Sequence, residues 1–231
     1  MKIASYLAMT AAEFQSAEQY PPHMAWMACH FSPYGTGLSN LPTFLPDNSL
    51  LILNDITPVF GHDPQRITEE LRCVAEEWNC DGILLDFQRP GEAQTRAITE
   101  AIAALPFPVG VTPQYAEHLS CAVFLPPLPL TTPLQDYLAP WSGRDIWLEI
   151  ATERDCIRVD RSGSHELRQD FIPIPLPHRD EALHCRYGMK VQENHIDFYL
   201  QRGKEEVAAL TEAGERLGIS RFVGLYQQFG K

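Results

Sequence analysis

The hydrophobic pattern of this chain alternates between short apolar runs and longer amphipathic segments. Apolar runs of about four to eight residues that end near Gly, Pro, Asn or Asp are typical of buried strands. Eight such runs occur, at residues 2–8, 24–31, 50–53, 83–86, 107–111, 121–125, 145–150 and 222–226. They predict eight strands spread along the chain.

Helical spacing of apolar residues fills several gaps between these runs, most clearly at residues 64–78, 92–105 and 204–217. Strands that alternate with helices predict parallel strands joined by crossovers. Eight of them indicate an α/β fold of the (β/α)8 TIM-barrel type, and the sequence lacks the glycine pattern of a Rossmann site. Because residues 32–48 and 112–120 have no clear helical pattern, we expect a compact, partly irregular barrel.

The alternation of strands and helices is interrupted before the last helix. Strand-like runs without helices between them predict two antiparallel hairpins, within residues 156–171 and 185–200. We therefore expect a single TIM-type domain over residues 1–231, with a small β-rich insertion over residues 152–202.

Polar residues follow the apolar run at 83–86, where Asp86, Gln88 and Arg89 stand close together. The carboxyl ends of barrel strands are the usual place for ligand binding and catalysis. We therefore expect a pocket centred on Asp86 and Gln88. Other polar or aromatic residues at strand ends or in the following loops are expected to line it: His30, Tyr34, Asp55, Arg89, Glu149, Tyr226 and Gln228.

The strand-end residues also have a purely structural interpretation. Asp86, Asp55 and Glu149 can accept hydrogen bonds from loop amides, or pair with Arg89, without any role in chemistry. Trp141 is a candidate platform for sugar rings, whereas Trp147 lies in an apolar run and is expected in the core.

Composition and charge narrow the function classes. A formal net charge of −12 and a pI near 5.0 argue against a nucleic-acid surface. The six cysteines are scattered without zinc-like spacing, so we expect buried free thiols. The histidines show no paired metal-ligand spacing, so we expect no metal site and no cofactor, with Asp55, His62 and Asp63 as the alternative that stays open. No run of apolar residues is long enough to span a membrane, and we expect a cytoplasmic protein whose partner is a glycan or another small molecule.

The segment Asp81-Gly82-Ile83-Leu84-Leu85-Asp86-Phe87-Gln88 resembles a motif of the family 18 glycoside hydrolases, the chitinase-like barrels. That family carries Asp-Gly-x-Asp-x-Asp-x-Glu at the end of its fourth barrel strand. The Asp-Gly start, the last Asp and the aromatic spacer match, but Leu84 replaces the middle Asp and Gln88 replaces the final Glu. The family's strand-six Met-x-Tyr-Asp pattern is absent, and Tyr226 at best replaces its strand-eight tryptophan.

The resemblance implies a chitinase-like barrel in which Asp86 and Gln88 occupy the family's catalytic positions. In that family the glutamic acid protonates the glycosidic oxygen, and a glutamine has no proton to give at neutral pH. We therefore expect a protein that binds a glycan or a related polymer without the hydrolytic step. Two alternatives stay open: an active carbohydrate enzyme that uses Asp86 with Asp55 or Glu149, and a non-catalytic interaction scaffold.

Overall fold

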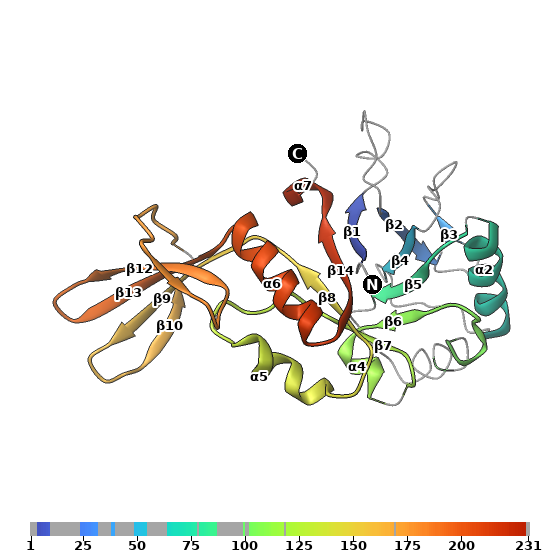
Figure 1. The fold of residues 1–231 in the computed structure, drawn as a ribbon, viewed down its shortest axis with the longest axis horizontal. Coiled ribbons are helices and arrows are strands. Elements are labelled where there is room, and N and C mark those ends of the chain that lie inside the picture. Colours follow the sequence, from blue (N-terminus) through green and yellow to red (C-terminus); the bar gives the residue numbers. More distant parts are fainter. Residues whose placement is uncertain are drawn as a thin grey trace. The chain divides into compact units, whose positions relative to one another are not determined.

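The structure of the chain is a computed structural model. It describes residues 4–9, 24–31, 38–39, 49–54, 64–77, 79–86, 99, 102–117, 119–168 and 170–229. The chain divides into two compact units. The barrel unit comprises Met1–Pro126, Gly143–Glu149 and Ile219–Lys231, and the β-rich unit comprises Pro127–Ser142 and Ile150–Gly218. Figure 1 shows the elements of both units.

The barrel unit is built on a nearly closed, barrel-like sheet. Its described strands are β1 (Ala4–Met9), β2 (Met24–Phe31), β3 (Leu38–Ser39), β4 (Leu50–Asn54), β5 (Gly82–Asp86), β6 (Val109–Val111), β7 (Ala122–Leu125), β8 (Ile146–Ile150) and β14 (Ile219–Leu225). Their order is β1-β14-β8-β7-β6-β5-β4-β2-β3. These described strands are parallel except for β3, which pairs with β2 in antiparallel orientation. β1 pairs in parallel with both β14 and β2, which brings the two sides of the sheet together. This arrangement confirms the α/β barrel class.

Helices lie between some of these strands or follow them. Helix α2 (Pro64–Glu77) precedes β5 and agrees with the amphipathic segment at 64–78. Helix α4 (Pro113–Ala116) lies between β6 and β7, where no helix was expected, so that part of the prediction was wrong. The four-residue length of α4 explains this, because one turn is too short to produce a helical repeat in the sequence. Helix α7 (Tyr226–Phe229) follows β14 directly.

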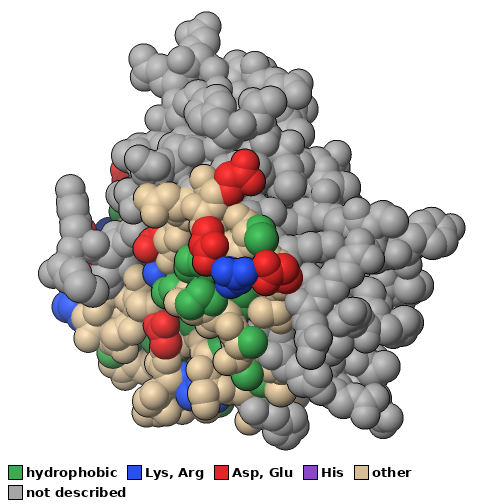
Figure 2. All heavy atoms as spheres, turned by 90° about the vertical axis from the view of Figure 1, so that its right-hand side faces the viewer, with side chains coloured by type: hydrophobic (Ala, Val, Ile, Leu, Met, Phe, Trp, Pro, Cys, Tyr) green, Lys and Arg blue, Asp and Glu red, His purple; other side chains and the backbone are tan. Residues whose placement is uncertain are grey.

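The exposed side of α2 carries paired charges. Arg72 contacts Glu69 at 2.6 Å and Glu76 at 3.4 Å, one turn away on either side. Figure 2 faces the side of the molecule where α2 lies in Figure 1, and shows carboxylates gathered beside a cationic side chain. These exposed pairs are expected to add little stability.

The inner face of the barrel is filled by one apolar cluster that draws on six strands. Its members are Tyr6, Ala8, Leu50, Ile52, Leu84, Ala122, Phe124, Trp147 and Val223. Trp147 is completely buried, as its apolar run predicted. A Cβ at Gly110 would lie 2.4 Å from the Trp147 ring, so only glycine leaves room for the indole at this point of β6. The guanidinium of Arg221 lies 4.5 Å from the ring centroid.

The β-rich unit is an antiparallel sheet with flanking helices. Its elements are α5 (Leu134–Leu138), the 3-10 helix η1 (Ala139–Trp141), β9 (Glu153–Asp160), β10 (His165–Arg168), β11 (His178–Asp180), β12 (Cys185–Val191), β13 (His195–Arg202) and α6 (Lys204–Arg216). The strand order is β10-β9-β13-β12-β11. β9 and β10 pair across the turn at 161–164, and β12 pairs with β13. The single domain with an insertion over residues 152–202 stays a prediction.

Arg202, at the end of β13, holds the separate parts of the β-rich unit together. Only 1% of its side chain is exposed. It donates to the Leu128 carbonyl at 2.5 Å, to the Leu183 and His184 carbonyls at 3.0 and 3.2 Å, and to Glu153 at 2.9 Å. A buried guanidinium needs such partners because an unpaired buried charge is costly. It thereby ties the segment before α5 to the sheet.

Five cysteines have described side chains, and all five are free thiols. Cys80, Cys156 and Cys185 are buried, Cys121 is half-buried and Cys73 is exposed. Burial raises the pKa of the Cys80 and Cys185 thiols to about 11, which keeps both protonated and unreactive at neutral pH. Within the same residues, no helix combines the length and the apolar character needed to cross a membrane.

Candidate functional site

Asp86 is the last residue of β5 and lies on the inner face of the barrel. Side chains alternate between the two faces of a strand, and Leu84, two residues earlier, belongs to the inner cluster. Asp86 is also half-buried, whereas Leu84 is 1% exposed. The strand therefore presents a core residue at position 84 and a carboxylate at its carboxyl end.

Glu149 reaches the same end of the barrel from β8. It follows Trp147 by two residues, so it also belongs to the inner face, and it is half-buried. Parallel strands that form one barrel end at the same rim. The alternation along β5 and β8 thus puts Asp86 and Glu149 on the inner face at the carboxyl-terminal rim, and their role in a pocket stays a prediction.

Thr112 is a third polar residue of this rim that the sequence did not single out. It directly follows β6, two residues after the inward-facing Gly110, and is only 5% exposed. Pro113 starts helix α4 immediately after it. The sequence does hold a signal for Thr112, because it stands between an apolar run and a proline. A residue in that position comes at the end of its strand, and the carboxyl ends of barrel strands form the rim.

Several predicted site residues lie outside the described residues. Tyr34, Asp55, Gln88 and Arg89 belong to this group. His30 lies within β2, but only its backbone is described. Their place in the pocket stays a prediction.

The predicted residues at the end of the last strand belong to a different element from the one expected. β14 ends at Leu225, so Tyr226 and Gln228 lie in helix α7 instead of at a strand end. Gln228 is half-buried, and only the backbone of Tyr226 is described. Because α7 begins directly after β14, both residues still follow the carboxyl end of a barrel strand.

The rim as described offers oxygen ligands and hydrogen-bonding groups, which suit hydroxyl-rich ligands. Glycoside hydrolysis by acid–base catalysis requires a pair of carboxyl groups, and the rim as described holds two. Among the described residues, no group of three His, Cys, Asp or Glu is arranged to hold a metal ion.

A separate cavity of about 950 Å³ opens near the amino ends of β6, β7 and β8. Its described lining includes Phe107, Val109, Leu119, Cys121 and Arg144. Arg144 donates to the carbonyls of Ala116, Leu119 and Cys121 at 3.1, 2.5 and 3.0 Å. These hydrogen bonds join the segment before β8 to the segment before β7. None of the described lining residues was predicted as a site residue.

Searches of protein families and curated sequences returned no match: no family model fits the chain, and no curated protein matches it. Solved structures do match. The spore cortex-lytic enzyme SleL of Bacillus cereus superposes with a TM-score of 0.56 at 10% identity, over 96% of this chain and 70% of that chain. SleL of Bacillus megaterium gives 0.51 at 12% identity over the same shares. A chitinase from Chromobacterium violaceum gives 0.51 at 9% identity, over 96% of this chain and 93% of its own.

The fold is chitinase-like. Identities of this size establish the arrangement of strands and helices, and they say nothing about which residues act. The likeness covers nearly the whole chain, so both units contribute to it. It supports the fold that the half-matched motif around Asp86 suggested.

Proposed function

We propose that this chain is a chitinase-like barrel protein that binds a glycan or a related polymer in the mouth of the barrel and does not hydrolyse it. The pocket centres on Asp86 and Gln88, with Glu149 and Thr112 on the same rim and Asp55, Arg89, His30, Tyr34, Tyr226 and Gln228 around it. The proposal includes an eight-stranded (β/α)8 barrel, with the β-rich region as an insertion.

The observation that carries the proposal is the inner face of β5. Leu84 lies in the apolar core, where the related family has an aspartate, and Asp86 follows it at the rim. Because Leu84 stands where the family's motif has its middle aspartate, this chain lacks one of the motif's carboxylates. The amide of Gln88 removes the proton donor. What stays is a carboxylate that can accept hydrogen bonds from sugar hydroxyls.

The structural neighbours support a carbohydrate ligand of a particular kind. Two of them are described as spore cortex-lytic enzymes and another as a chitinase. Muropeptides and chito-oligosaccharides are therefore the first ligands to try. Their N-acetylated sugars offer both hydroxyls and amide groups to a rim of oxygen-bearing side chains.

A second candidate is an active glycoside hydrolase in which Asp86 and Glu149 act as a pair. Their shared inner-face position favours it, because a general acid and a second carboxylate must both face the scissile bond. In this case hydrolysis would not depend on Gln88.

The test is a binding titration by calorimetry, with chitohexaose and purified muropeptides, followed by mass spectrometry of each mixture for products. We expect binding without product. Asp86→Asn should weaken binding about tenfold, the effect of losing a charge-assisted hydrogen bond or two. Asp136→Asn, a change of the same type on the exposed side of α5, should have no effect.

Turnover by the native chain that disappears in both Asp86→Asn and Glu149→Gln would overturn the non-hydrolytic proposal and establish the second candidate. Absence of binding to every ligand of both classes would favour a scaffold. Circular dichroism of each variant separates a lost contact from a lost fold.

A further inference from the structure

The two faces of the sheet in the β-rich unit differ in chemistry. Strand register assigns side chains to faces, because directly opposed residues of an antiparallel pair point the same way. On one face, Phe198 is opposed by Ile157 and Met189, and Ile157 in turn by Leu167. We call this the apolar face; its apolar residues are Ile157, Val159, Leu167, Tyr187, Met189, Val191, Ile196, Phe198 and Leu200. The register also places Glu153, Asp155, His165, His178 and Arg202 on this face.

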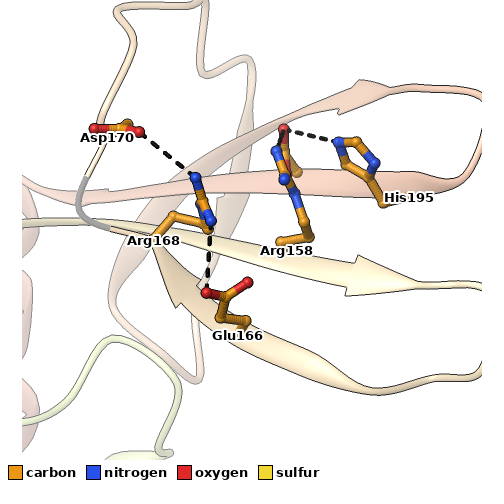
Figure 3. A network of polar contacts seen from close by, with 6 residues as sticks. Arg158, Glu166, Arg168, Asp170 and His195 are labelled. Carbon is orange, nitrogen blue, oxygen red and sulfur yellow. Dashed lines mark hydrogen bonds and ion pairs between the residues drawn. The ribbon is translucent and has the colours of Figure 1, made fainter.

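The opposite face is ionic and is covered by the chain itself. Arg158 pairs with Asp197 at 2.8 Å, and Arg168 pairs with Glu166 and Asp170 at 3.5 and 3.6 Å (Figure 3). The segment after β10 packs on this face, since the Phe171 ring meets Tyr199 edge-on at 5.7 Å. The carbonyl of Pro175 approaches the backbone so closely that a Cβ at Gly188 would lie 2.4 Å from it.

The apolar face is covered only at one end. Leu130, Cys185 and Leu200 form a buried cluster there, with Tyr187 and Phe198 packed against it. Further along the strands, 66% of Leu167, 47% of Met189 and 68% of Val191 are exposed. A sheet with one apolar face normally buries that face, and large exposed apolar patches mark interaction surfaces.

A cavity of about 500 Å³ opens on the apolar face. Ile157, Val159, Leu183, Tyr187, Phe198 and Leu200 form its apolar wall. His165, Asp180 and the phenol of Tyr187 are the titratable side chains among its lining residues. A sugar ring needs several hydrogen-bonding partners, so this cavity suits aliphatic or aromatic side chains better than a glycan.

Two carboxylates at this end of the sheet make no direct ion pair, although Arg202 attracts Asp155 from further away. Asp155 belongs to the apolar face because it opposes Leu200, and Asp180 lines the cavity. One oxygen of Asp180 accepts hydrogen bonds from the amides of Ala182 and Leu183 at 2.9 and 3.0 Å. Among the described residues, no Lys, Arg or His lies within ion-pair distance of either carboxylate, in contrast to Glu166, Asp170 and Asp197 on the ionic face. On the apolar face itself, Glu153 is paired with Arg202.

We propose that the apolar face of the β-rich unit docks a basic amphipathic helix of a partner protein. Its apolar stripe would fill the cavity and cover Leu167 and Met189, and its Lys or Arg residues would pair with Asp155 and Asp180. An amphipathic helix laid into an apolar groove is an established mode of recognition. Because Asp155 and Asp180 are negatively charged, charge complementarity favours a positively charged helix.

The same charges disfavour a second copy of this chain as the occupant. Two copies packed face to face would bring their unpaired Asp155 and Asp180 carboxylates into one interface, and like charges there repel. The formal net charge of −12 adds to that repulsion.

The test uses the full chain and a fluorescein-labelled synthetic helix of leucine and lysine, about four turns long, whose binding is followed by fluorescence anisotropy. A matched peptide with glutamate in place of lysine is the control. We expect the lysine peptide to bind with a Kd on the order of 10 μM at about 50 mM salt, and more weakly at about 0.5 M salt. The glutamate peptide should not bind.

Variants locate the site on the apolar face. The double variant Asp155→Asn with Asp180→Asn should weaken binding about fivefold to tenfold, roughly the effect of losing two partly exposed ion pairs. Asparagine keeps the oxygen that accepts the turn amides at position 180. Leu167→Ser, at an exposed position, should weaken binding about fivefold without unfolding the sheet. Glu166→Gln, its neighbour on the ionic face, is the matched control and should leave the Kd within about twofold.

Three results would overturn the proposal. Equal weakening by Glu166→Gln and the double variant would mean that the peptide senses only net charge. Binding of the glutamate peptide would remove the argument from charge. A dimer of the native chain in light scattering, broken by Leu167→Ser, would assign the face to a second copy.

Discussion

The phenol of Tyr6 on β1 donates a hydrogen bond to the carboxylate of Asp81, which stands just before β5 and 75 residues later in the chain. Arg221 on β14 completes the contact: it donates to the Asp81 carbonyl at 3.1 Å and lies 3.4 Å from the Asp81 carboxylate and from the Tyr6 oxygen. Three elements that are distant in sequence thus meet inside the barrel, on the amino-terminal side of the strands. Asp81 begins the motif that suggested a chitinase-like fold, and here it helps to close the barrel.

Removing the phenol oxygen with Tyr6→Phe should lower the free energy of unfolding by about 1–3 kcal/mol, because the half-exposed Asp81 loses a buried donor. Urea unfolding followed by tryptophan fluorescence measures this change. Tyr187→Phe, on the apolar face of the β-rich unit, is the matched control and should change stability by less. Equal effects of the two variants would contradict a special role for the Tyr6 contact.

The same contact predicts a loss of stability at alkaline pH. Burial, followed by the hydrogen bond to Asp81, raises the pKa of Tyr6 to about 12 from an ordinary value of 10.0. A raised pKa in the folded state means that the stabilisation is complete below pH 10 and is lost as the pH rises from 10 through 12. The difference in stability between the native chain and Tyr6→Phe should therefore shrink over that range. A constant difference would contradict the prediction.

Gly110→Ala should destabilise the barrel, because its Cβ would lie 2.4 Å from the buried Trp147 ring. The expected cost is about 1–3 kcal/mol, typical of overpacking. Combining it with Trp147→Phe, which shortens the ring, should give a loss smaller than the sum of the two single losses. Thermal unfolding of the four chains forms the cycle, and strict additivity would show that the two residues do not compete for space.

Asp197 makes the β-rich unit sensitive to acid. The hydrogen bond from Arg158 holds the pKa of this carboxyl below its usual range, and His195 lies 3.5 Å away (Figure 3). A lowered pKa in the folded state stabilises the protein above the ordinary pKa of 3.8, and this contribution is lost as the pH falls below that value.

Asp197→Asn should therefore lower the Tm at pH 7 by on the order of 2–4 °C, and this difference should shrink as the pH falls below 3.8. Calorimetry at pH 7 and at a series of acidic pH values checks this. Glu166→Gln, whose exposed ion pair with Arg168 lies on the same face, should change the Tm little at any of these pH values. A Tm difference that persists in acid would rule out the titration of Asp197 as the cause.

Gln88→Glu should introduce weak hydrolysis of chito-oligosaccharides, since it restores a group that can protonate the glycosidic oxygen. Product formation above the native chain, measured by mass spectrometry and abolished by Asp86→Asn, is the expected result. Failure of Gln88→Glu in a chain that still binds the ligand would assign the missing activity to Leu84 or to the residues after β7. Leu84→Asp is not a clean repair, because position 84 is part of the apolar core.

The sequence by itself determined the order of strands, several helices and the parallel barrel class. Its apolar runs are short, and amphipathic segments separate many of them, so each strand and its crossover could be recognised locally. The apolar run at residues 145–150 also predicted that Trp147 lies in the core, where it is completely buried. The motif around Asp86 is also a short continuous segment, so its resemblance to the chitinase-like family could be recognised from the sequence.

Tertiary structure alone decided which distant residues meet. No local sequence pattern indicated that Tyr6 donates a hydrogen bond to Asp81, or that Arg202 donates to three carbonyls and to Glu153. None indicated that Asp155 and Asp180 lie on the apolar face of the β-rich unit. Such contacts depend on strand register and on the closure of the sheet, which follow from packing over the whole chain and not from any short segment. The inward position of Asp86 and Glu149 has the same origin, because only a closed barrel gives a strand an inside.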